Sequence, residues 1–316
     1  MKRILVTFFL LAVTCFSYSQ TTYYWVGGTG PVSFTANANW NTSLDGTGTT
    51  RTASAANDIL IFDGSNIGGS SATTGAVIAT ATSTSFGQLK LQNGANVNLG
   101  RSATGSATLT LTGDGTAAVD LEVDAGCTLT LGSAVYNYDV NIVVTANATA
   151  LISGTVYLSP LSTTVHTRSF ITAAAANNVV FASGSACHIT DSLATSGFNA
   201  SVANGVLFKT GASLYYYSGR SPIGNNSTTQ FTNFEPGSNL YFMQSNASYV
   251  DGTTAYASSS WVNQKTLANV YVLNGSVLKA DGPVNKIENL SISNTSSFIT
   301  HTSGNTPVLG NLTVDG

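Results

Sequence analysis

Charged side chains are scarce in this sequence. Asp, Glu, Lys and Arg make up 8% of its 316 residues, whereas an ordinary globular domain has about 25%. The 11 basic and 14 acidic residues give a net charge of −3, and the chain lacks the clustered Lys and Arg that nucleic-acid binding requires. We therefore expect no nucleic-acid partner. Disorder is also excluded, because 43% of the residues are apolar and disordered chains are poor in such residues.

Good helix formers are few as well. Glu, Lys and Gln are sparse, while Thr, Val, Tyr and Gly are abundant, and this balance favours strands and turns over long helices. Of the three cysteines, Cys15 lies in the N-terminal apolar run, and Cys127 and Cys187 are too few for a disulfide scaffold. We expect these last two to be buried as small hydrophobic residues in separate parts of the fold.

Long apolar runs are absent except at the start of the chain. Met1-Lys2-Arg3 precedes an apolar run over residues 4–16 and a short polar exit that ends at Gln20. This pattern predicts a secretory signal peptide over residues 1–20, because a membrane span needs roughly 20 apolar residues. We therefore expect export from a Gram-negative bacterium to its surface or beyond, with no membrane span.

A strand–turn–strand unit recurs along the chain. Residues 89–99 alternate apolar and polar side chains on both sides of the turn Asn93-Gly94. Further copies occupy residues 119–131, 180–189, 207–217, 231–242 and 270–278, and a degenerate copy over 142–152 turns at Asn147-Ala148. The turn glycines are Gly94, Gly126, Gly184, Gly211, Gly237 and Gly275. All but one of the intervals between them fall within the period of roughly 20–50 residues that indicates stacked repeats, and the longer interval contains the degenerate copy.

The predicted fold is therefore all-β, a parallel β-helix (β-solenoid) over residues 71–316. Tandem β-sandwiches are the alternative, since Asn-Gly turns also favour hairpins. Residues 21–70 differ from the repeats and contain Trp25 and Trp40; we expect them to cap the open end of the solenoid. The segment 308–316 has the pattern of the first half of another repeat, so we expect the solenoid to continue beyond this sequence.

The N-terminal region resembles a known group. Trp-Val-Gly-Gly-Thr-Gly at 25–30, Ala-Asn-Trp at 38–40 and the segment 57–64 are similar to the opening of large secreted repeat proteins, including autotransporter-like adhesins and type IX-secreted surface proteins of Bacteroidota. The resemblance covers the start of the chain as far as about Ser65. It implies a parallel β-helix with a surface or adhesive role and no catalysis. The C-terminal sorting domain of the type IX group has no counterpart here, which leaves the mode of attachment open.

One row of carboxylates is a candidate site. Asp120, Glu122 and Asp124 alternate along a predicted strand and would share its outward face. A Ca²⁺ site is one interpretation, but Ca²⁺ takes 6–8 oxygen ligands, so a solvated strand face is favoured and no cofactor is expected. His166, His188 and His301 are scattered, and no catalytic residue is predicted.

Aromatic residues are the second candidate. Tyr215, Tyr216, Tyr217, Tyr241 and Trp261 gather in the second half of the chain, and exposed rings could stack on sugars. Core filling and stacking between repeats are the alternative for most of them. The sequence thus predicts an extracellular, non-enzymatic structural or adhesive solenoid, with glycans or host and matrix surface proteins as partners. The alternative is a glycan-binding or polysaccharide-degrading β-helix.

Overall fold

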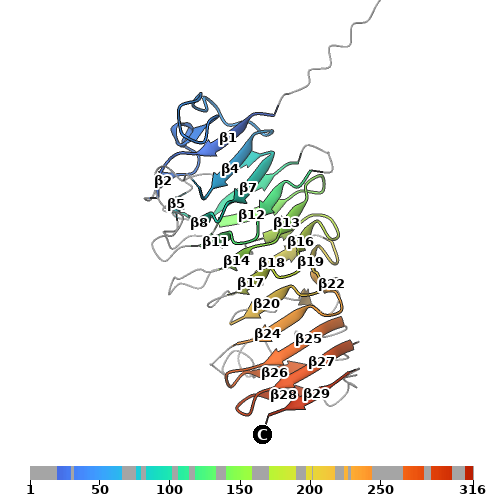
Figure 1. Cartoon of the computed structure of the whole chain (residues 1–316). Helices are drawn as coiled ribbons and strands as arrows, with labels where there is room; N and C mark the ends of the chain where they lie inside the picture. The colour runs from blue at the N-terminus through green and yellow to red at the C-terminus, as the bar shows by residue number, and fades with distance from the viewer. Residues whose placement is uncertain are drawn as a thin grey trace, which may run out of the picture.

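The computed structural model describes residues 20–29, 32–65, 76–79, 83–101, 106–113, 118–132, 140–158, 171–189, 197–200, 202–217, 224–226, 229–243, 266–280, 286–300 and 310–315. The chain forms an elongated stack of short strands that runs from the N-terminal region at one end to β29 at the other (Figure 1). The only helical element in these residues is a 3₁₀ turn, η1 (Asn37–Asn39). In this part of the chain, no helix is long and apolar enough to cross a membrane.

Three sheets form the sides of the stack. Sheet 1 has the order β23 (Thr232–Phe234), β19 (Val206–Phe208), β16 (Val179–Phe181), β13 (Ala150–Ile152), β10 (Leu121–Val123), β7 (Gln88–Gln92), β4 (Ile59–Asp63), β1 (Thr22–Trp25) and β3 (Trp40–Asn41). Sheet 2 has the order β2 (Val32–Ser33), β5 (Ala76–Ala79), β8 (Asn96–Gly100), β11 (Thr128–Leu131), β14 (Thr155–Leu158), β17 (Ala186–Ile189), β20 (Ser213–Tyr216), β24 (Asn239–Phe242), β25 (Thr266–Val272), β27 (Lys286–Ile292) and β29 (Leu312–Val314). Sheet 3 has the order β18 (Phe198–Ala200), β15 (Ile171–Ala173), β12 (Val140–Val144), β9 (Ala107–Leu111) and β6 (Thr84–Phe86).

Two smaller pairs complete the described strands. β21 (Gly224–Asn226) pairs antiparallel with β22 (Thr229–Gln230), and β26 (Val277–Ala280) pairs parallel with β28 (Ser297–Thr300). Both pairs lie outside the three main sheets.

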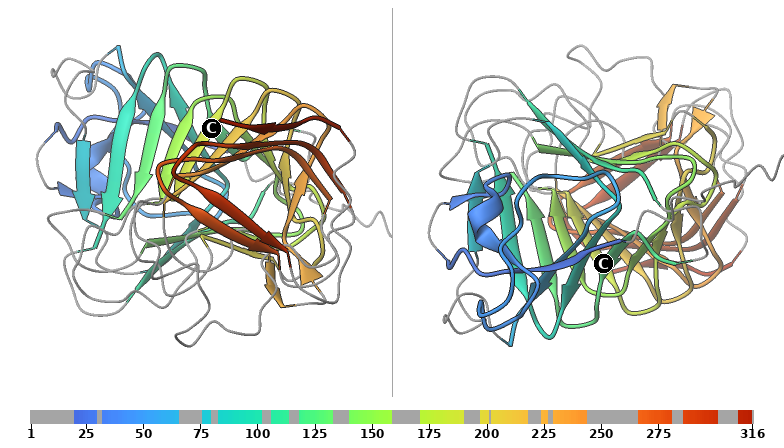
Figure 2. Two further views of the ribbon diagram at one scale, coloured as in Figure 1. Left: turned by 90° about the horizontal axis from the view of Figure 1, so that it is seen from below. Right: turned by 90° about the horizontal axis from the view of Figure 1, so that it is seen from above.

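Successive coils contribute one strand to each of the three sheets. From β6 to β20 the chain visits sheets 3, 1 and 2 in turn, and each strand pairs in parallel with its counterpart in the next coil. Leu89 thus pairs with Leu121 and, farther along, Phe208 pairs with Phe234. Figure 2 looks along the stack from both ends and shows the strands arranged around a common interior. The predicted β-solenoid is confirmed, and the alternative of tandem β-sandwiches is wrong, because the repeats pair in parallel between coils.

The interior is built by the predicted alternation. Leu89, Leu91, Val97 and Leu99 are fully buried, while the alternating polar residues of the two strands are half-buried on the outward face: Lys90, Gln92, Asn96 and Asn98. Farther along the stack, Phe208 lies between the rings of Phe181 (centroids 4.5 Å apart, planes 1° apart) and Phe234 (5.1 Å, 13°). In-register parallel pairing thus places like residues on top of one another inside the stack.

The corner between sheets 1 and 2 carries the turn glycines. Asn93 and Gly94 adopt φ values of 55° and 74°, a left-handed conformation that Gly and Asn tolerate best. At the end of β4, the buried carboxylate of Asp63 accepts hydrogen bonds from the side chains of Gln92 (2.7 Å) and Asn93 (2.8 Å). It also accepts bonds from the backbone and hydroxyl of Ser65, so this carboxylate ties two neighbouring coils together at the corner.

Two of the predicted copies are placed differently in the structure. The first is the degenerate copy, in which Asn147-Ala148 turns between β12 and β13, at the corner between sheets 3 and 1. The corner between sheets 1 and 2 in that coil is instead Ser153-Gly154, which lies about midway between the turn glycines of the coils before and after it. A Cβ at Gly154 would overlap the backbone oxygens of the coil before it, so the short turn requires glycine.

The second is the copy over 270–278, which the repeat pattern predicts to begin in the same sheet as the others. Its first strand, β25, instead continues sheet 2 from β24, so the last coils are out of phase with the earlier ones. Asn274-Gly275 therefore turns from sheet 2 into β26. The coils also become shorter here, since Val270 pairs with Leu290 and Leu290 pairs with Leu312.

The N-terminal end has its own packing. β1 pairs in parallel with β4 and antiparallel with β3, which forms the edge of sheet 1. Trp25 packs edge-on against Trp40, with ring centroids 5.1 Å apart, and both rings are fully buried against Phe62. Residues 1–19 and 66–75 lie outside the described residues, so the signal peptide and the boundary near residue 70 stay predictions.

Candidate functional site

Five aromatic rings form one column on the outward face of sheet 2. We call this column the ring ladder; its members are Tyr157, His188, Tyr215, Tyr241 and Tyr271, from β14, β17, β20, β24 and β25. Successive ring centroids are 4.5, 4.5, 4.6 and 4.5 Å apart, and successive planes differ by 17°, 5°, 6° and 13°. The ladder is therefore roughly 18 Å long, and its spacing is close to the strand separation of about 4.8 Å.

Strand alternation explains why these rings point outward. Tyr215 is half-buried, whereas Leu214 and Tyr216 on either side of it are fully buried in the core. Because the coils pair in register, an outward ring in one coil stacks on the outward ring of the next. Each such contact contributes about 0.5–1.5 kcal/mol beyond the area that it buries.

A second column runs beside the ring ladder. Asn239, Asn269 and Asn289 form what we call the amide ladder, two positions before the ring or its equivalent in β24, β25 and β27. Nδ2 of Asn269 donates to Oδ1 of Asn239 (3.0 Å), and Nδ2 of Asn289 donates to Oδ1 of Asn269 (2.6 Å). Nδ2 of Asn239 donates in the same direction to the hydroxyl of Ser213 (3.4 Å). An asparagine amide has two N–H groups, and one of them takes part in this chain of bonds.

The two ladders contain no Asp, Glu, Lys or Arg. Burial lowers the pKa of His188, because the imidazolium form is disfavoured away from water. Burial, followed by the proximity of Tyr215 and Tyr271, raises the pKa of Tyr241. The face therefore offers hydroxyl, amide and neutral ring groups in rows.

Comparison with known proteins adds no relative. No family model, curated protein or solved structure matches the chain. The candidate site is accordingly defined by its geometry, as the outward face of sheet 2 from β14 to β27. Figure 1 shows that these strands follow one another along one side of the stack.

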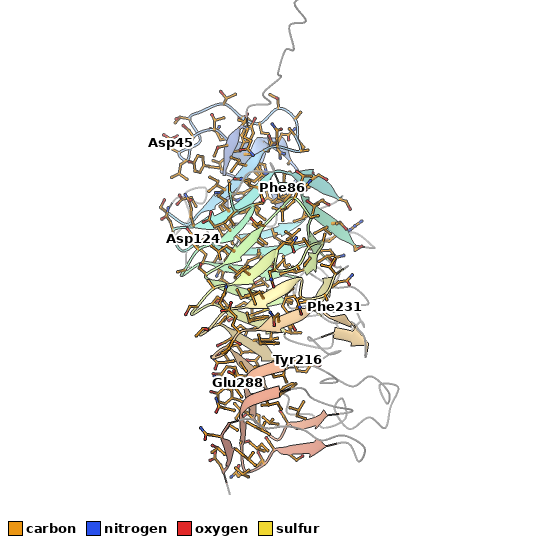
Figure 3. The ribbon with its side chains drawn as sticks, turned by 90° about the vertical axis from the view of Figure 1, so that its right-hand side faces the viewer. Asp45, Phe86, Asp124, Tyr216, Phe231 and Glu288 are labelled. Carbon is orange, nitrogen blue, oxygen red and sulfur yellow. The ribbon has the colours of Figure 1, made fainter. Side chains whose placement is uncertain are left out.

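The predicted aromatic set is only partly brought together. Tyr215 and Tyr241 belong to the ring ladder, and Tyr217 lies next to it, 6.1 Å from the His188 ring. The prediction that Tyr216 (labelled in Figure 3) is a glycan-binding residue is wrong. Its side chain is 0% exposed, and its ring packs against that of Phe242. The alternation of the strand sends it inward, where it cannot contact a surface ligand. Trp261 lies outside the described residues.

The predicted aromatic set does not contain three members of the ring ladder: Tyr157, His188 and Tyr271. A signal for one of them is present, since His188, Tyr215 and Tyr241 each stand four positions after a turn glycine. Tyr157 follows Gly154 by three positions and Tyr271 precedes its turn, so neither fits that rule.

The predicted row of carboxylates does not share one face. Asp120 is 1% exposed and accepts a hydrogen bond from the backbone N–H of Thr149 (2.8 Å), because β10 begins only at Leu121 and Asp120 lies in the bend before it. Glu122 pairs with Lys90 at 3.1 Å. Burial, and then the negative charge of Glu122, raises the pKa of Asp124. Within the described ranges, no group of three His, Cys, Asp or Glu side chains is arranged to hold a metal ion.

The cysteines occupy the interior as predicted. Cys127 and Cys187 are free and buried, the first just before β11 and the second within β17 of a later coil. Burial raises the pKa of both thiols, so neither resembles an activated nucleophile.

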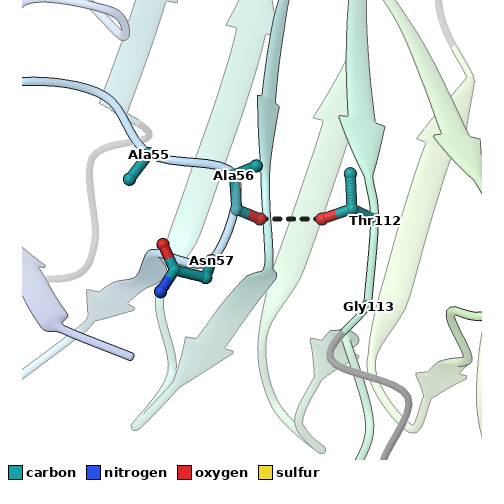
Figure 4. Close-up of a pocket in the computed structure, with 5 residues that line it drawn as sticks. All are labelled: Ala55, Ala56, Asn57, Thr112 and Gly113. Carbon is teal, nitrogen blue, oxygen red and sulfur yellow. Dashed lines mark hydrogen bonds between the residues drawn. The ribbon is translucent and has the colours of Figure 1, made fainter. Parts of the chain in front are cut away.

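A cavity of about 480 Å³ lies away from the ladders, lined by Ala55, Ala56, Asn57, Thr112 and Gly113 (Figure 4). The Thr112 hydroxyl donates a hydrogen bond to the Ala56 carbonyl (2.7 Å). These lining residues carry no acid, base or nucleophile with a shifted pKa, so the cavity does not compete with the ladder face as a candidate site.

Proposed function

We propose that this protein is an exported, non-enzymatic β-solenoid that serves a structural and adhesive role at the surface of a Gram-negative bacterium or outside the cell. The observation that carries the proposal is the face of sheet 2, on which five stacked rings and three linked amides repeat at the coil spacing. A face of this kind presents the same groups at every step, so weak contacts to a long partner add up along it.

The composition supports the same role. Rows of one charge repel when coils stack at about 4.8 Å, whereas neutral polar rows stack without that cost. With 8% charged residues, the chain supplies Ser, Thr, Asn and Tyr for its outward rows. Such surfaces suit hydrogen bonding to neutral partners rather than steering of charged ones.

Binding is favoured over polysaccharide cleavage by what surrounds the carboxylates. General acid–base catalysis needs acidic and basic groups that reach the substrate. Asp120 is buried and hydrogen-bonded, and Glu122 is paired with Lys90. The proposal therefore assigns Asp120 and Glu122 to the architecture and the ladders to the partner.

The test is a binding screen of the purified chain on immobilised neutral polysaccharides, acidic polysaccharides and matrix proteins, with product analysis of each supernatant. We expect retention on at least one neutral surface without released sugars. A variant in which Tyr215 and Tyr241 are changed to Ser should lose retention. The matched control changes Thr110 and Thr172, which are half-buried outward residues of sheet 3, to Ala and should keep it.

Two results would overturn the proposal. Soluble sugar products would make the protein an enzyme. Equal retention of the ladder variant and the sheet 3 control would move adhesion to another face. Circular dichroism of each variant ensures that a loss of retention does not reflect a loss of folding.

A further inference from the structure

Stacking hides the ring faces inside the ladder. Each of the three middle rings has a neighbour about 4.5 Å away on both sides, with nearly parallel planes. Such a ring presents only its edge and its polar atom outward. The apolar C–H face of a pyranose packs against the face of an aromatic ring rather than its edge, so the middle of the ladder is unsuited to stacking a sugar.

The C-terminal end of the ladder is different. The residue that pairs with Tyr271 in the next coil is Ser291, whose side chain is a single hydroxymethyl group. Among the described residues, the ring of Tyr271 stacks only on that of Tyr241. The ladder therefore ends with one ring face directed toward a position that the next coil fills with a serine.

Polar groups border this position. Asn289 lies two positions before Ser291 on β27, its side chain is exposed, and it is the last residue of the amide ladder. Its Oδ1 also accepts a hydrogen bond from the backbone N–H of Asn311 (3.3 Å), which holds the amide in place. A flat ring at the serine position would meet the Tyr271 face on one side, with the Asn289 amide and the Ser291 hydroxyl beside it.

The geometry points to a binding site for one pyranose unit of a neutral glycan at Ser291, stacked on Tyr271 as the next ring of the ladder and hydrogen-bonded by Asn289 and Ser291. This inference rests on the proposed adhesive function and names its ligand class and its position. A neutral sugar is favoured because the ring and amide ladders carry no formal charge, whereas an acidic sugar would lose hydration without a cation in the ladders to replace it.

The opposite end of the ladder does not offer the same combination. Tyr157 pairs with Thr130, whose branched side chain is larger than that of serine. The neighbouring column at that end carries Thr128 and Thr155 in place of asparagine. The coil next to Tyr157 therefore has no amide in that column, and the nearest amides, Asn96 and Asn98, lie one coil farther away.

The test measures binding of cellohexaose, laminarihexaose and mannohexaose to the full purified chain by isothermal titration calorimetry, with a galacturonate oligomer as the acidic comparison. Ser291→Tyr adds a sixth ring that occupies the site, and Tyr271→Ala removes the stacking face. Each should weaken binding of the preferred neutral hexasaccharide by about tenfold or more, the loss of roughly one good aromatic contact.

Two variants serve as controls. Tyr271→Phe keeps the ring face and should bind within about threefold of the unaltered chain, since it loses at most one exposed hydrogen bond. Thr130→Tyr adds a ring at the other end of the ladder and should leave binding unchanged. Because both tyrosine additions lengthen the ladder by one ring, a general effect of a longer stack would appear in both.

The outcomes separate this inference from the adhesive function. If Ser291→Tyr and Tyr271→Ala bind as tightly as the unaltered chain, the pyranose site is wrong and adhesion stands. If the unaltered chain is retained on a surface but binds none of the neutral hexasaccharides, the same conclusion follows. If it binds neither surfaces nor oligosaccharides, both proposals fall. Tyr271→Ala keeps the test decisive should Ser291→Tyr fail to fold.

Discussion

The core stack of phenylalanines allows a quantitative prediction about stability. Phe208 is 0% exposed and lies between Phe181 and Phe234, with ring centroids 4.5 and 5.1 Å away. Replacing a buried Phe with Ala costs about 3–5 kcal/mol, and the cost rises when the surroundings cannot collapse into the cavity. Parallel hydrogen bonding on both sides of β19 fixes the spacing of the coils. We therefore expect Phe208→Ala to lower the free energy of unfolding by about 4 kcal/mol.

The assay combines urea unfolding, followed by circular dichroism, with hydrogen exchange resolved by segment. In a stacked repeat each unit contacts only its neighbours, so exchange should accelerate most in β16, β19 and β23. The adjacent Lys209→Ala serves as a control: its side chain is 45% exposed and pairs with Glu235 at 2.6 Å, a contact that contributes less than about 1 kcal/mol. A loss below about 1 kcal/mol in Phe208→Ala, or faster exchange spread evenly to β4, would refute the reasoning.

Four further predictions concern single positions. Gly154→Ala should destabilise the chain more than Gly126→Ala, because a Cβ at Gly154 would overlap backbone atoms of the previous coil. A Cβ at Gly126 has free space around it, so alanine there adds only the strain of a φ of 83°. Thermal unfolding of the two variants compares these effects. The pKa of His188 is lowered by burial, so its contribution to stability is present above the unfolded pKa of about 6.5 and is lost as pH falls through the folded pKa; an NMR titration with urea unfolding at several pH values measures both. Burial raises the pKa of Asp63, but its hydrogen bonds together outweigh burial and lower that pKa. The contribution of Asp63 to the free energy of unfolding should therefore be present above about pH 4 and be lost below it. Asp63→Asn should lower the free energy of unfolding by about 1–3 kcal/mol, measured by urea unfolding at neutral pH. N-terminal sequencing of the exported protein should show cleavage after Gln20.

The parts of the fold that the sequence predicts are those governed by local alternation. Residues 89–99 have the inward and outward faces that the pattern indicates, and Asn93-Gly94 forms the turn between β7 and β8. Strand period and turn chemistry depend on neighbouring residues alone, which is why they can be read directly. The parallel pairing followed from the repetition of one unit along the chain.

The features of the fold that the sequence did not predict depend on contacts between coils. Gly154 was missed because its turn is shorter than the others and adopts no left-handed φ; only the carbonyls of the previous coil reveal why glycine is needed there. The shift of β25 into sheet 2 leaves the local pattern unchanged. Asp120 alternates with Glu122 in the sequence, but β10 begins only at Leu121, so Asp120 lies outside the strand. The ring ladder likewise emerges only when the coils are aligned.

Most coils keep the corner between sheets 1 and 2 at the same length, which bears on how such a molecule can change in evolution. The stretches Leu91 to Val97 and Phe208 to Leu214 are equally long across the corner between sheets 1 and 2, although the coil that contains the first is longer than the coil that contains the second. Apart from the coil that turns at Ser153-Gly154, where the corner is two residues shorter, length differences are thus absorbed elsewhere in the coil. Gene duplication of a single coil would lengthen the molecule by about 4.8 Å and leave both faces of the corner intact. The length of the molecule can therefore change by whole coils without changing the residues that contact a partner.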